Sequence, residues 1–290
     1  MSVAALARHS FGSMGVEIEC LVEGDDMGGF EAVEREFTRF DHLFSRFRPD
    51  SELSRLNTLG AARCSAELLE VVGLALDARE RTDGRFDPTV HDAIVDAGYD
   101  RTFRLLPEDA GSDPAASRPC GGRVEIDRRR SAITLGSGVR LDLGGIVKGW
   151  AAERCCALLP APCLVNAAGD IAVRGVPADG FWGIGADTAD GSITLALVRG
   201  GIATSGRDRR RWRRAGVERH HLIDPSTGAC SASDLVRVTA TGSDAVDAEV
   251  NATALFLAGE RAALQEAERE SIHCLLVTGD GRTVGWGGLV

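Results

Sequence analysis

Lys148 is the only lysine among the 33 lysines and arginines of the chain. It follows Gly144-Gly145 within residues 141–149, whose sequence is LDLGGIVKG. A chain that otherwise uses arginine has kept one ammonium here, which indicates a place where a flat guanidinium does not fit. An ammonium on a flexible stem suits a phosphate or a ring heteroatom. The alternative is a single lysine that survives by chance on a helix surface.

Polar residues also gather where predicted helices and strands end, and such ends often form ligand sites. Four stretches share this feature: residues 86–89, 166–170, 203–206 and 221–228. Each stretch taken singly is also an ordinary turn signal. Glu249 and Thr253 lie four residues apart on a predicted helix, so their carboxylate and hydroxyl share one face. The sequence contains no Walker A, G-x-G-x-x-G or G-x-S-x-G motif. Nucleotide binding or hydrolysis by the mechanisms that use these common motifs is therefore not supported.

Length and composition exclude several classes of protein. With 290 residues and 44% hydrophobic content, the chain can form one large domain or two fused lobes. No stretch approaches the roughly 18 apolar residues of a membrane span, and the first residues show no export signal, so we expect a cytoplasmic protein. The eight cysteines lack C-x-x-C spacing and are expected to be reduced. A net charge of −10 argues against nucleic acid and anionic membranes as partners.

The first half of the chain predicts two helices and a hairpin. Phenylalanines and Val33 recur at spacings of three and four over residues 29–47, which predicts an amphipathic helix that ends before Pro49. A second helix is capped by Ser65 and ends near Asp83-Gly84. Residues 107–122 are predicted to be a surface loop, and residues 124–127 and 132–135 a hairpin.

The second half alternates short strands with helices. A strand over 141–143 is followed by a helix that starts at Gly144-Gly145 and runs to 159. Further strands are predicted at 164–166, 171–174, 181–184, 193–198, 202–205 and 235–240, a helix at 247–258, a third helix, and a closing strand at 274–278. Residues 207–214 are expected to form a solvated hairpin that leads to His221. The pattern favours a single α+β domain with mixed or antiparallel sheets flanked by helices.

Taken in order, these motifs resemble the FAD:protein FMN transferases, the ApbE family. The resemblance covers almost the whole chain. Its eight matching stretches are Met14-Gly15-Val16, residues 45–57, Phe86-Asp87-Pro88-Thr89-Val90, residues 142–149, Asn166-Ala167-Ala168-Gly169-Asp170, Ala203-Thr204-Ser205-Gly206, residues 221–228, and residues 248–256.

The resemblance implies a phosphoryl transfer and an ApbE-like fold. Such an enzyme takes FAD as its substrate, moves the FMN half onto a Thr or Ser hydroxyl of an acceptor flavoprotein and releases AMP. The reaction needs neutralised phosphates, an in-line geometry and a group that takes the hydroxyl proton. Glu249 and Thr253 offer two hard oxygen ligands, which suit Mg²⁺. The resemblance implies the main-chain carbonyl of Gly145 as a third metal ligand.

The resemblance also implies the remaining site residues. His221 is the expected proton acceptor, since a neutral imidazole works near pH 7, although it can equally orient a phosphate. Lys148 is expected to contact the flavin or its diphosphate, and Phe47 to stack on the isoalloxazine in place of a tyrosine. The other expected FAD contacts are Met14, Phe86, Asp87, Asp142, Asn166, Asp170, Thr204, Ser205 and Ile223.

Besides Phe47, four positions of this chain depart from the family pattern. Glu249 stands where the family has Asp, which affects the position or choice of metal. Val16 replaces Thr, Val147 replaces Ala, and Ala168 replaces a Gly, which reduces the room beside the flavin. Two other functions use the same residues and stay open: an FAD pyrophosphatase that gives FMN and AMP, and a non-catalytic flavin-binding protein.

Overall fold

The computed structural model describes residues 5–24, 28–107, 109 and 118–287. It divides the chain into two compact units. Unit 1 comprises Met1–Phe40, Ile146–Ser205 and Ser233–Val290, and unit 2 comprises Asp41–Gly145 and Gly206–Ala232. The single-domain organisation stays a prediction, and so does the surface loop, most of which lies outside the described residues.

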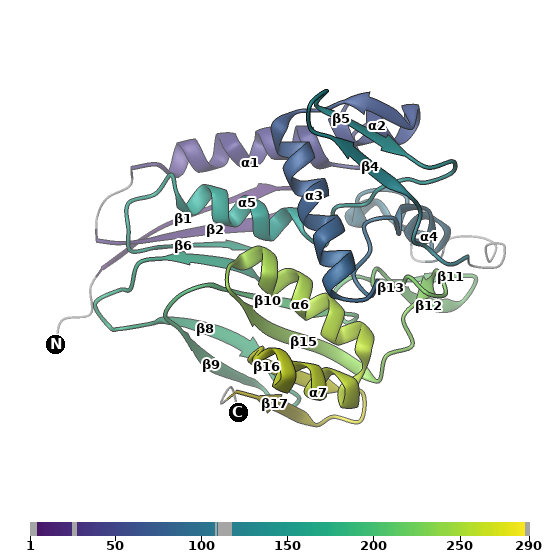
Figure 1. The fold of residues 1–290 in the computed structure, drawn as a ribbon. Coiled ribbons are helices and arrows are strands. Elements are labelled where there is room, and N and C mark those ends of the chain that lie inside the picture. Colours follow the sequence, from purple (N-terminus) through teal and green to yellow (C-terminus); the bar gives the residue numbers. More distant parts are fainter. Residues whose placement is uncertain (1–4, 25–27, 108, 110–117, 288–290) are drawn as a thin grey trace. The chain divides into compact units, whose positions relative to one another are not determined.

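An eight-stranded sheet forms the centre of unit 1 (Figure 1). Its strand order is β1-β2-β6-β7-β10-β15-β16-β17. The strands are β1 (Leu6–Ser13), β2 (Val16–Glu23), β6 (Cys163–Ala167), β7 (Asp170–Arg174), β10 (Gly201–Gly206), β15 (Leu235–Gly242), β16 (Cys274–Thr278) and β17 (Thr283–Trp286). The pairs β1–β2, β2–β6, β6–β7, β7–β10, β15–β16 and β16–β17 are antiparallel, and β10 lies beside β15.

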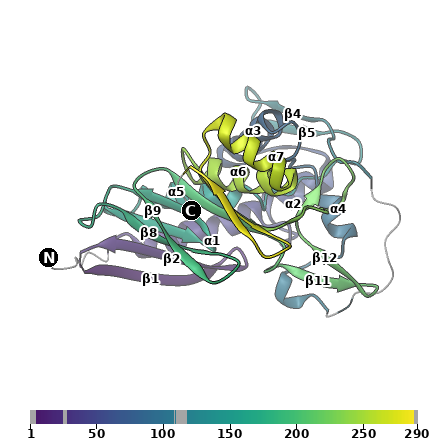
Figure 2. The same ribbon diagram turned by 90° about the horizontal axis from the view of Figure 1, so that it is seen from below.

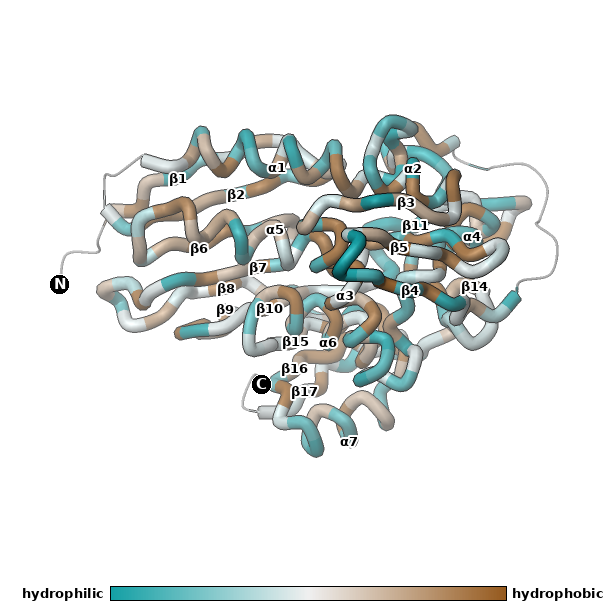
Figure 3. The backbone as a smooth tube through the Cα atoms, turned by 45° about the horizontal axis from the view of Figure 1, so that its top comes forward, coloured by the Kyte–Doolittle hydropathy of each residue, from teal (hydrophilic) through white to brown (hydrophobic). Residues whose placement is uncertain are grey.

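Helices cover one face of this sheet. They are α1 (Phe30–Phe44), α5 (Val147–Cys156) and α6 (Ala245–Ala258), and α7 (Glu260–Glu270) follows α6 along the chain (Figures 1 and 2). In Figure 3, brown and teal alternate along α1, as expected of a helix with one apolar face. Phe37 and Phe40 are fully or almost fully buried, and the Phe40 ring lies 4.8 Å from that of Trp150 in α5.

A two-stranded hairpin packs against the sheet through a second apolar cluster. It consists of β8 (Trp182–Asp187) and β9 (Ser192–Leu197), which pair antiparallel. Trp182, Ile184 and Leu195 pack in one buried cluster with Leu164 of β6 and Ile171 of β7. Leu164 and Ile171 lie on the same face of the sheet. Leu164 pairs with Val173, and Val173 lies two residues from Ile171 along β7, so both point to the same side. The sheet is therefore covered on both faces at its centre.

A close approach of two helices sets the position of the site in unit 1. A Cβ atom on Gly149 of α5 would lie 2.5 Å from the carbonyl oxygen of Ala245 in α6, so only glycine fits there. The Gly149 N–H donates to Glu249 Oε2 at 2.9 Å. The first turn of α5 is therefore fixed against the first turns of α6.

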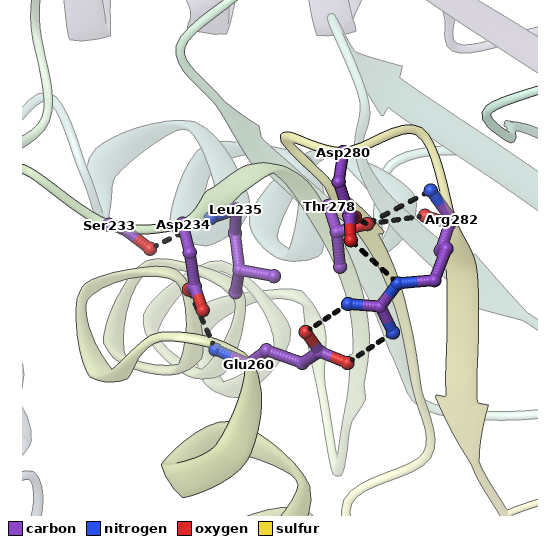
Figure 4. Close-up of polar contacts among 7 residues, drawn as sticks. All are labelled: Ser233, Asp234, Leu235, Glu260, Thr278, Asp280 and Arg282. Carbon is purple, nitrogen blue, oxygen red and sulfur yellow. Dashed lines mark hydrogen bonds and ion pairs between the residues drawn. The ribbon is translucent and has the colours of Figure 1, made fainter.

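A polar cluster fixes the C-terminal part of unit 1 (Figure 4). Arg282 donates to both carboxylate oxygens of Glu260 at the start of α7, at 2.8 and 2.7 Å, and to Asp280 at 2.9 Å. Asp234 accepts the Glu260 N–H at 2.9 Å, just before β15. These contacts join α7 to the β16–β17 hairpin.

Unit 2 contains shorter elements. Its helices are α2 (Glu52–Leu59), α3 (Ala66–Arg81), α4 (His91–Asp96) and the 3₁₀ turn η1 (Phe103–Leu105). Its strands are β3 (Ala61–Arg63), β4 (Val124–Asp127) and β5 (Ala132–Leu135) in the order β3-β5-β4, together with the hairpins β11 (Arg211–Arg214)–β12 (Val217–His220) and β13 (Ile223–Asp224)–β14 (Ala229–Cys230). The Ser65 side chain accepts the Leu68 N–H at 3.2 Å and caps α3.

The fold class predicted from the sequence is confirmed, and so are the hairpin over 124–135, the Ser65 cap and the hairpin that leads to His221. The boundaries of two helices were wrong, and one strand was missed. The first helix ends at Phe44 rather than 47, and α5 runs from Val147 to Cys156 rather than from Gly144 to 159. Strand β17 follows the strand predicted to close the chain.

The strand predicted over 141–143 was also wrong, and the reason is an asparagine. The Asn57 side chain donates to the Leu141 carbonyl and accepts the Leu141 N–H, both at 2.8 Å. The Asp142 N–H donates to the Pro88 carbonyl, also at 2.8 Å. A side-chain amide thus supplies hydrogen bonds that a neighbouring strand would otherwise supply.

Within the described residues, none of the helices is long and apolar enough to cross a bilayer.

Candidate functional site

Three charged side chains meet in unit 1. Lys148 lies in the first turn of α5, Asp170 begins β7, and Glu249 lies in α6. The Lys148 Nζ donates to Asp170 Oδ2 and to Glu249 Oε1. The side chains are 14%, 5% and 3% exposed, so this ion cluster is almost removed from solvent.

The cluster carries one more negative than positive charge. Burial, and after it the neighbouring Asp170, raises the pKa of Glu249, while the Lys148 ammonium and the Gly149 N–H oppose the rise; the net result is a pKa of about 7. Two carboxylates share a single ammonium. A divalent cation or a second donor is the kind of group that would balance such a site.

Hydroxyl groups extend the cluster along α6 and β10. Thr253, one turn after Glu249, lies with its Oγ1 2.9 Å from Ser205 Oγ. Thr204 Oγ1 lies 2.9 Å from Thr239 Oγ1 in β15. The i, i+4 relation of Glu249 and Thr253 on one helix face is confirmed, since α6 is continuous from Ala245 to Ala258.

The oxygen donors fit a hard divalent cation. Among the described residues no group of three or more His, Cys, Asp or Glu side chains is suited to a metal. Mg²⁺ does not require such a group, because it binds through one or two carboxylates and completes its shell with water and substrate phosphates. Glu249 and Thr253 provide a carboxylate and a hydroxyl on adjacent turns of one helix. The third predicted ligand, the Gly145 carbonyl, belongs to unit 2.

The predicted site residues of unit 1 gather at one end of its sheet. The β1–β2 turn holds Met14 and the β6–β7 turn follows Asn166 and precedes Asp170. Ile18 pairs with Ala167 and Ile202 with Ile171, so both turns and the end of β10 with Thr204 and Ser205 lie at the same end. Asn166 Oδ1 accepts the Gly169 N–H at 2.7 Å and fixes the second turn.

In unit 2, Phe86 and Asp87 lie in a rigid turn before α4. Asp87 Oδ1 accepts the N–H and the hydroxyl of Thr89 at 2.8 and 2.7 Å, and its Oδ2 pairs with Arg79 Nε at 3.2 Å. A Cβ on Gly145 would lie 3.2 Å from Phe86 Cε2. The structure thus brings Phe86 and Gly145 together, and the ring leaves little room for a larger residue.

Arg46 links two of the predicted flavin contacts in unit 2. Its Nε lies 2.6 Å from Asp142 Oδ2, and both side chains are less than a tenth exposed. Its Nη1 donates to the Tyr99 carbonyl at 2.7 Å, and its guanidinium carbon lies 4.1 Å from the centre of the Phe47 ring. Sequence reasoning missed this residue. The only signal was a cation directly before the aromatic residue predicted to stack on the flavin.

The other predicted residues of unit 2 lie near the β11–β12 hairpin. His221 directly follows β12 and is half-buried, and Ile223 is buried in an apolar cluster against which Phe47 packs. The neighbouring His220 is the buried one: its Nε2 lies 3.1 Å from the Ser231 carbonyl oxygen, and burial lowers its pKa. Of the two adjacent histidines, His221 is therefore the more accessible.

Comparisons with known proteins identify the fold and the family. The ApbE protein from Thermotoga maritima superposes with a TM-score of 0.85 at 25% identity, over 97% of each chain. The flavin transferase ApbE from Vibrio cholerae superposes with a TM-score of 0.76 at 23% identity, over 98% of this chain and 97% of the other. The fold is thus that of the ApbE flavin transferases.

Sequence comparison gives the family. The FAD:protein FMN transferase of Vibrio cholerae is 28% identical over 267 residues, which cover 86% of this chain and 79% of the relative. That of Treponema pallidum is 27% identical over 295 residues, which cover 89% and 80%. The model of the ApbE family matches residues 14–276. The chain belongs to the ApbE family.

Proposed function

We propose that this protein is an FAD:protein FMN transferase that uses Mg²⁺ and modifies a Thr or Ser hydroxyl. The observation that carries the proposal is the buried cluster of Lys148, Asp170 and Glu249, with Thr253 one turn away. A lysine and two carboxylates are not needed to hold two helices and a strand together, since apolar residues do this at lower cost. Their presence at a sheet end rich in small and hydroxyl residues suits a diphosphate substrate.

The reaction exchanges the phosphoanhydride bond of FAD for a phosphoester bond to the acceptor. The acceptor hydroxyl oxygen forms a bond to the phosphorus on the FMN side of the diphosphate. The bond from that phosphorus to the bridging oxygen breaks, and AMP leaves with the electron pair. The hydroxyl proton goes to the base, which we assign to His221 because it is the more accessible of two adjacent histidines.

The remaining roles follow from chemistry. Mg²⁺ would be held by Glu249, Thr253 and the Gly145 carbonyl, and when bound it neutralises charge on the diphosphate. Lys148 adds a positive charge in the same cluster and partly compensates the two carboxylates. Phe47, Phe86 and Ile223 supply apolar contacts for the flavin, and Asp142 supplies a carboxylate whose orientation Arg46 fixes.

Incubation with FAD, Mg²⁺ and candidate flavoproteins tests the proposal. Mass spectrometry of the acceptor is expected to show an added FMN group on one Thr or Ser, with an equal amount of AMP released. FMN and AMP produced without any modified acceptor would identify a pyrophosphatase instead. FAD binding without turnover would identify a flavin-binding protein. The cytoplasmic location of the protein and of its acceptor stays a prediction.

A further inference from the structure

The β11–β12 hairpin has a charge opposite to that of the rest of the chain. Between Arg207 and Arg219 the sequence holds seven arginines and only two acidic residues, whereas the whole chain has a net charge of −10. No part of the proposed reaction uses these arginines. A concentrated positive charge on an acidic protein requires its own explanation.

A buried tryptophan anchors this hairpin in unit 2. Trp212 is 7% exposed, and its Nε1 donates to the Ala97 carbonyl at 2.8 Å at the end of α4. Its ring lies 5.4 Å from that of Tyr99. Gly98 leaves room for the indole ring of Trp212, because a Cβ atom at position 98 would lie 3.1 Å from Trp212 Nε1. Trp212 therefore anchors the hairpin, and Arg214 Nη1 adds a hydrogen bond to the Val95 carbonyl at 3.4 Å.

Strand alternation then directs the neighbours of Trp212 to solvent. Arg211 and Arg213 flank the buried Trp212 and are exposed, as is Arg209, two residues earlier. The Arg211 side chain is 61% exposed. These three arginines are called the arginine row. Arg211 and Arg213 lie on one side of a short ribbon that is paired from Arg211–His220 to Arg214–Val217, and Arg209 lies in the bend before it.

The acidic groups around the arginine row do not balance it. Glu218 lies 3.8 Å from Arg211 Nη1 and pairs with Arg213 across the strands. The Asp109 carboxylate accepts the Gly216 N–H at 2.9 Å, and Asp208 is the remaining acid of the segment. Asp100 also attracts Arg214. These four acids stand against the seven arginines between Arg207 and Arg219. A fixed excess of guanidinium groups remains.

The hairpin also leads directly to the expected base. β12 ends at His220, and His221 is the next residue. Because Arg211 pairs with His220 across the hairpin, the start of β11 lies directly beside the residue that precedes His221. A polypeptide bound along the row is thus a short distance from the group that would take a hydroxyl proton.

We propose that the arginine row is a docking surface for an acidic polypeptide segment that flanks the acceptor hydroxyl in the protein substrate. The proposal rests on the transferase function and specifies its partner. Guanidinium groups bind carboxylates through paired hydrogen bonds, and three in a row match a segment with several Asp or Glu. A short peptide fits a four-residue strand, whereas an extended polyanion such as nucleic acid would also meet the repulsion of the acidic chain.

Labelled peptides with one central Thr test the docking surface. The Thr is flanked by Asp and Glu, by Asn and Gln, or by Lys. Fluorescence anisotropy without FAD measures binding, and mass spectrometry with FAD and Mg²⁺ measures FMN transfer. We expect the acidic peptide to bind about tenfold more tightly than the neutral one at low salt, with the difference lost at high salt.

Charge reversal provides the decisive comparison. Arg211→Glu with Arg213→Glu is expected to remove the preference for the acidic peptide and to create one for the lysine peptide. The matched control is Arg35→Glu with Arg269→Glu, which makes the same change in net charge at two exposed positions of unit 1 and should preserve the preference. FAD binding by calorimetry should be the same in all three proteins.

The two proposals fail in different ways. FMN transfer that is equally efficient for acidic, neutral and basic peptides would overturn the docking surface and leave the transferase function standing. Binding of the acidic peptide that depends on the arginine row, without any FMN transfer, would support the surface and refute the transferase function. Tighter binding of a single-stranded oligonucleotide of equal length would overturn the assignment to an acidic polypeptide.

Discussion

The Lys148 ammonium and the Glu249 carboxylate form a buried ion pair between α5 and α6, 101 residues apart in sequence. The chain itself therefore supplies part of the positive charge that balances the carboxylate expected to bind a metal. Asp170 shares the same ammonium. Removing one partner of a buried ion pair leaves an uncompensated charge, which typically costs about 3–5 kcal/mol. Lys148 thus acts as a built-in counter-ion as well as an expected phosphate contact.

Lys148→Met is expected to lower the free energy of unfolding by about 3 kcal/mol in the absence of divalent cations, because two buried carboxylates lose their counter-ion. Mg²⁺ should restore more stability to this variant than to the wild type. Chemical denaturation with and without Mg²⁺ measures both effects. Arg154→Met, an exposed change on the same helix, is the control. Equal responses to Mg²⁺ in the two variants would show that the ion does not reach this cluster.

The substitutions at Glu249 and Thr253 test the metal ligands. Glu249→Gln should abolish FMN transfer while FAD binding falls less, because most contacts to the flavin and adenine remain. Thr253→Val should raise the Mg²⁺ concentration for half-maximal rate tens-of-fold, since each ~1.4 kcal/mol corresponds to a factor of ten. Glu249→Asp restores the residue usual in the family and should retain activity. Unchanged Mg²⁺ titrations in both Glu249→Gln and Thr253→Val would place the ion elsewhere.

Much of this architecture could be predicted from local patterns. The Ser65 cap, the hairpin over 124–135 and helix α6 depend on neighbouring residues, and the sequence shows them directly. The Glu249–Thr253 pair follows from helical periodicity alone. The family motifs identified the residues at the sheet end before their register was known.

Contacts between distant residues could not be predicted in this way. The Asn57 side chain occupies the hydrogen bonds of Leu141, 84 residues away, so an apolar triplet that looks like a strand is not one. The Arg46–Asp142 pair depends on the same kind of distant approach. The two partners of Lys148 come from separate elements, β7 and α6. A composition bias draws attention to the lysine but does not identify these partners.

Arg46 is expected to matter for FAD binding although it is not a predicted FAD contact. Arg46→Lys keeps the charge but loses the planar group that pairs with Asp142 and covers Phe47. We expect FAD affinity to fall about tenfold, which corresponds to ~1.4 kcal/mol. Calorimetric titration with FAD measures the change. Arg101→Lys, at an exposed arginine paired with Asp100, should bind FAD normally. Equal FAD affinity of the two variants would show that Arg46 does not contribute to FAD binding.

Glu153 is expected to make stability depend on pH. Burial raises the pKa of its carboxyl above the ordinary 4.5, and Asp244 adds to the rise, although the Ala245 N–H at 2.8 Å opposes it. A folded-state pKa above the unfolded value contributes stability at low pH that is lost as the pH rises through the folded value. Glu153→Gln keeps an acceptor for that N–H and removes the charge. The free energy of unfolding of the variant should therefore increase relative to that of the wild type between pH 4 and pH 8 in denaturation experiments. A difference in this free energy that does not change with pH would contradict the assignment.

Ala168 is expected to be a source of backbone strain in the β6–β7 turn. Its φ of +58° is in the left-handed region, which disfavours residues with a Cβ, and the family has glycine at this position. Ala168→Gly should raise the free energy of unfolding by about 0.5–1 kcal/mol, since relief of ~1–2 kcal/mol of strain is partly offset by the entropy of glycine in the unfolded chain. The matched control is Ala262→Gly on the exposed side of α7, where the same substitution should destabilise by about 1 kcal/mol. Denaturation curves measure both changes, and the opposite signs separate backbone conformation from any general effect of glycine. Destabilisation by Ala168→Gly would mean that the methyl group of Ala168 makes a contact stronger than the strain of its backbone.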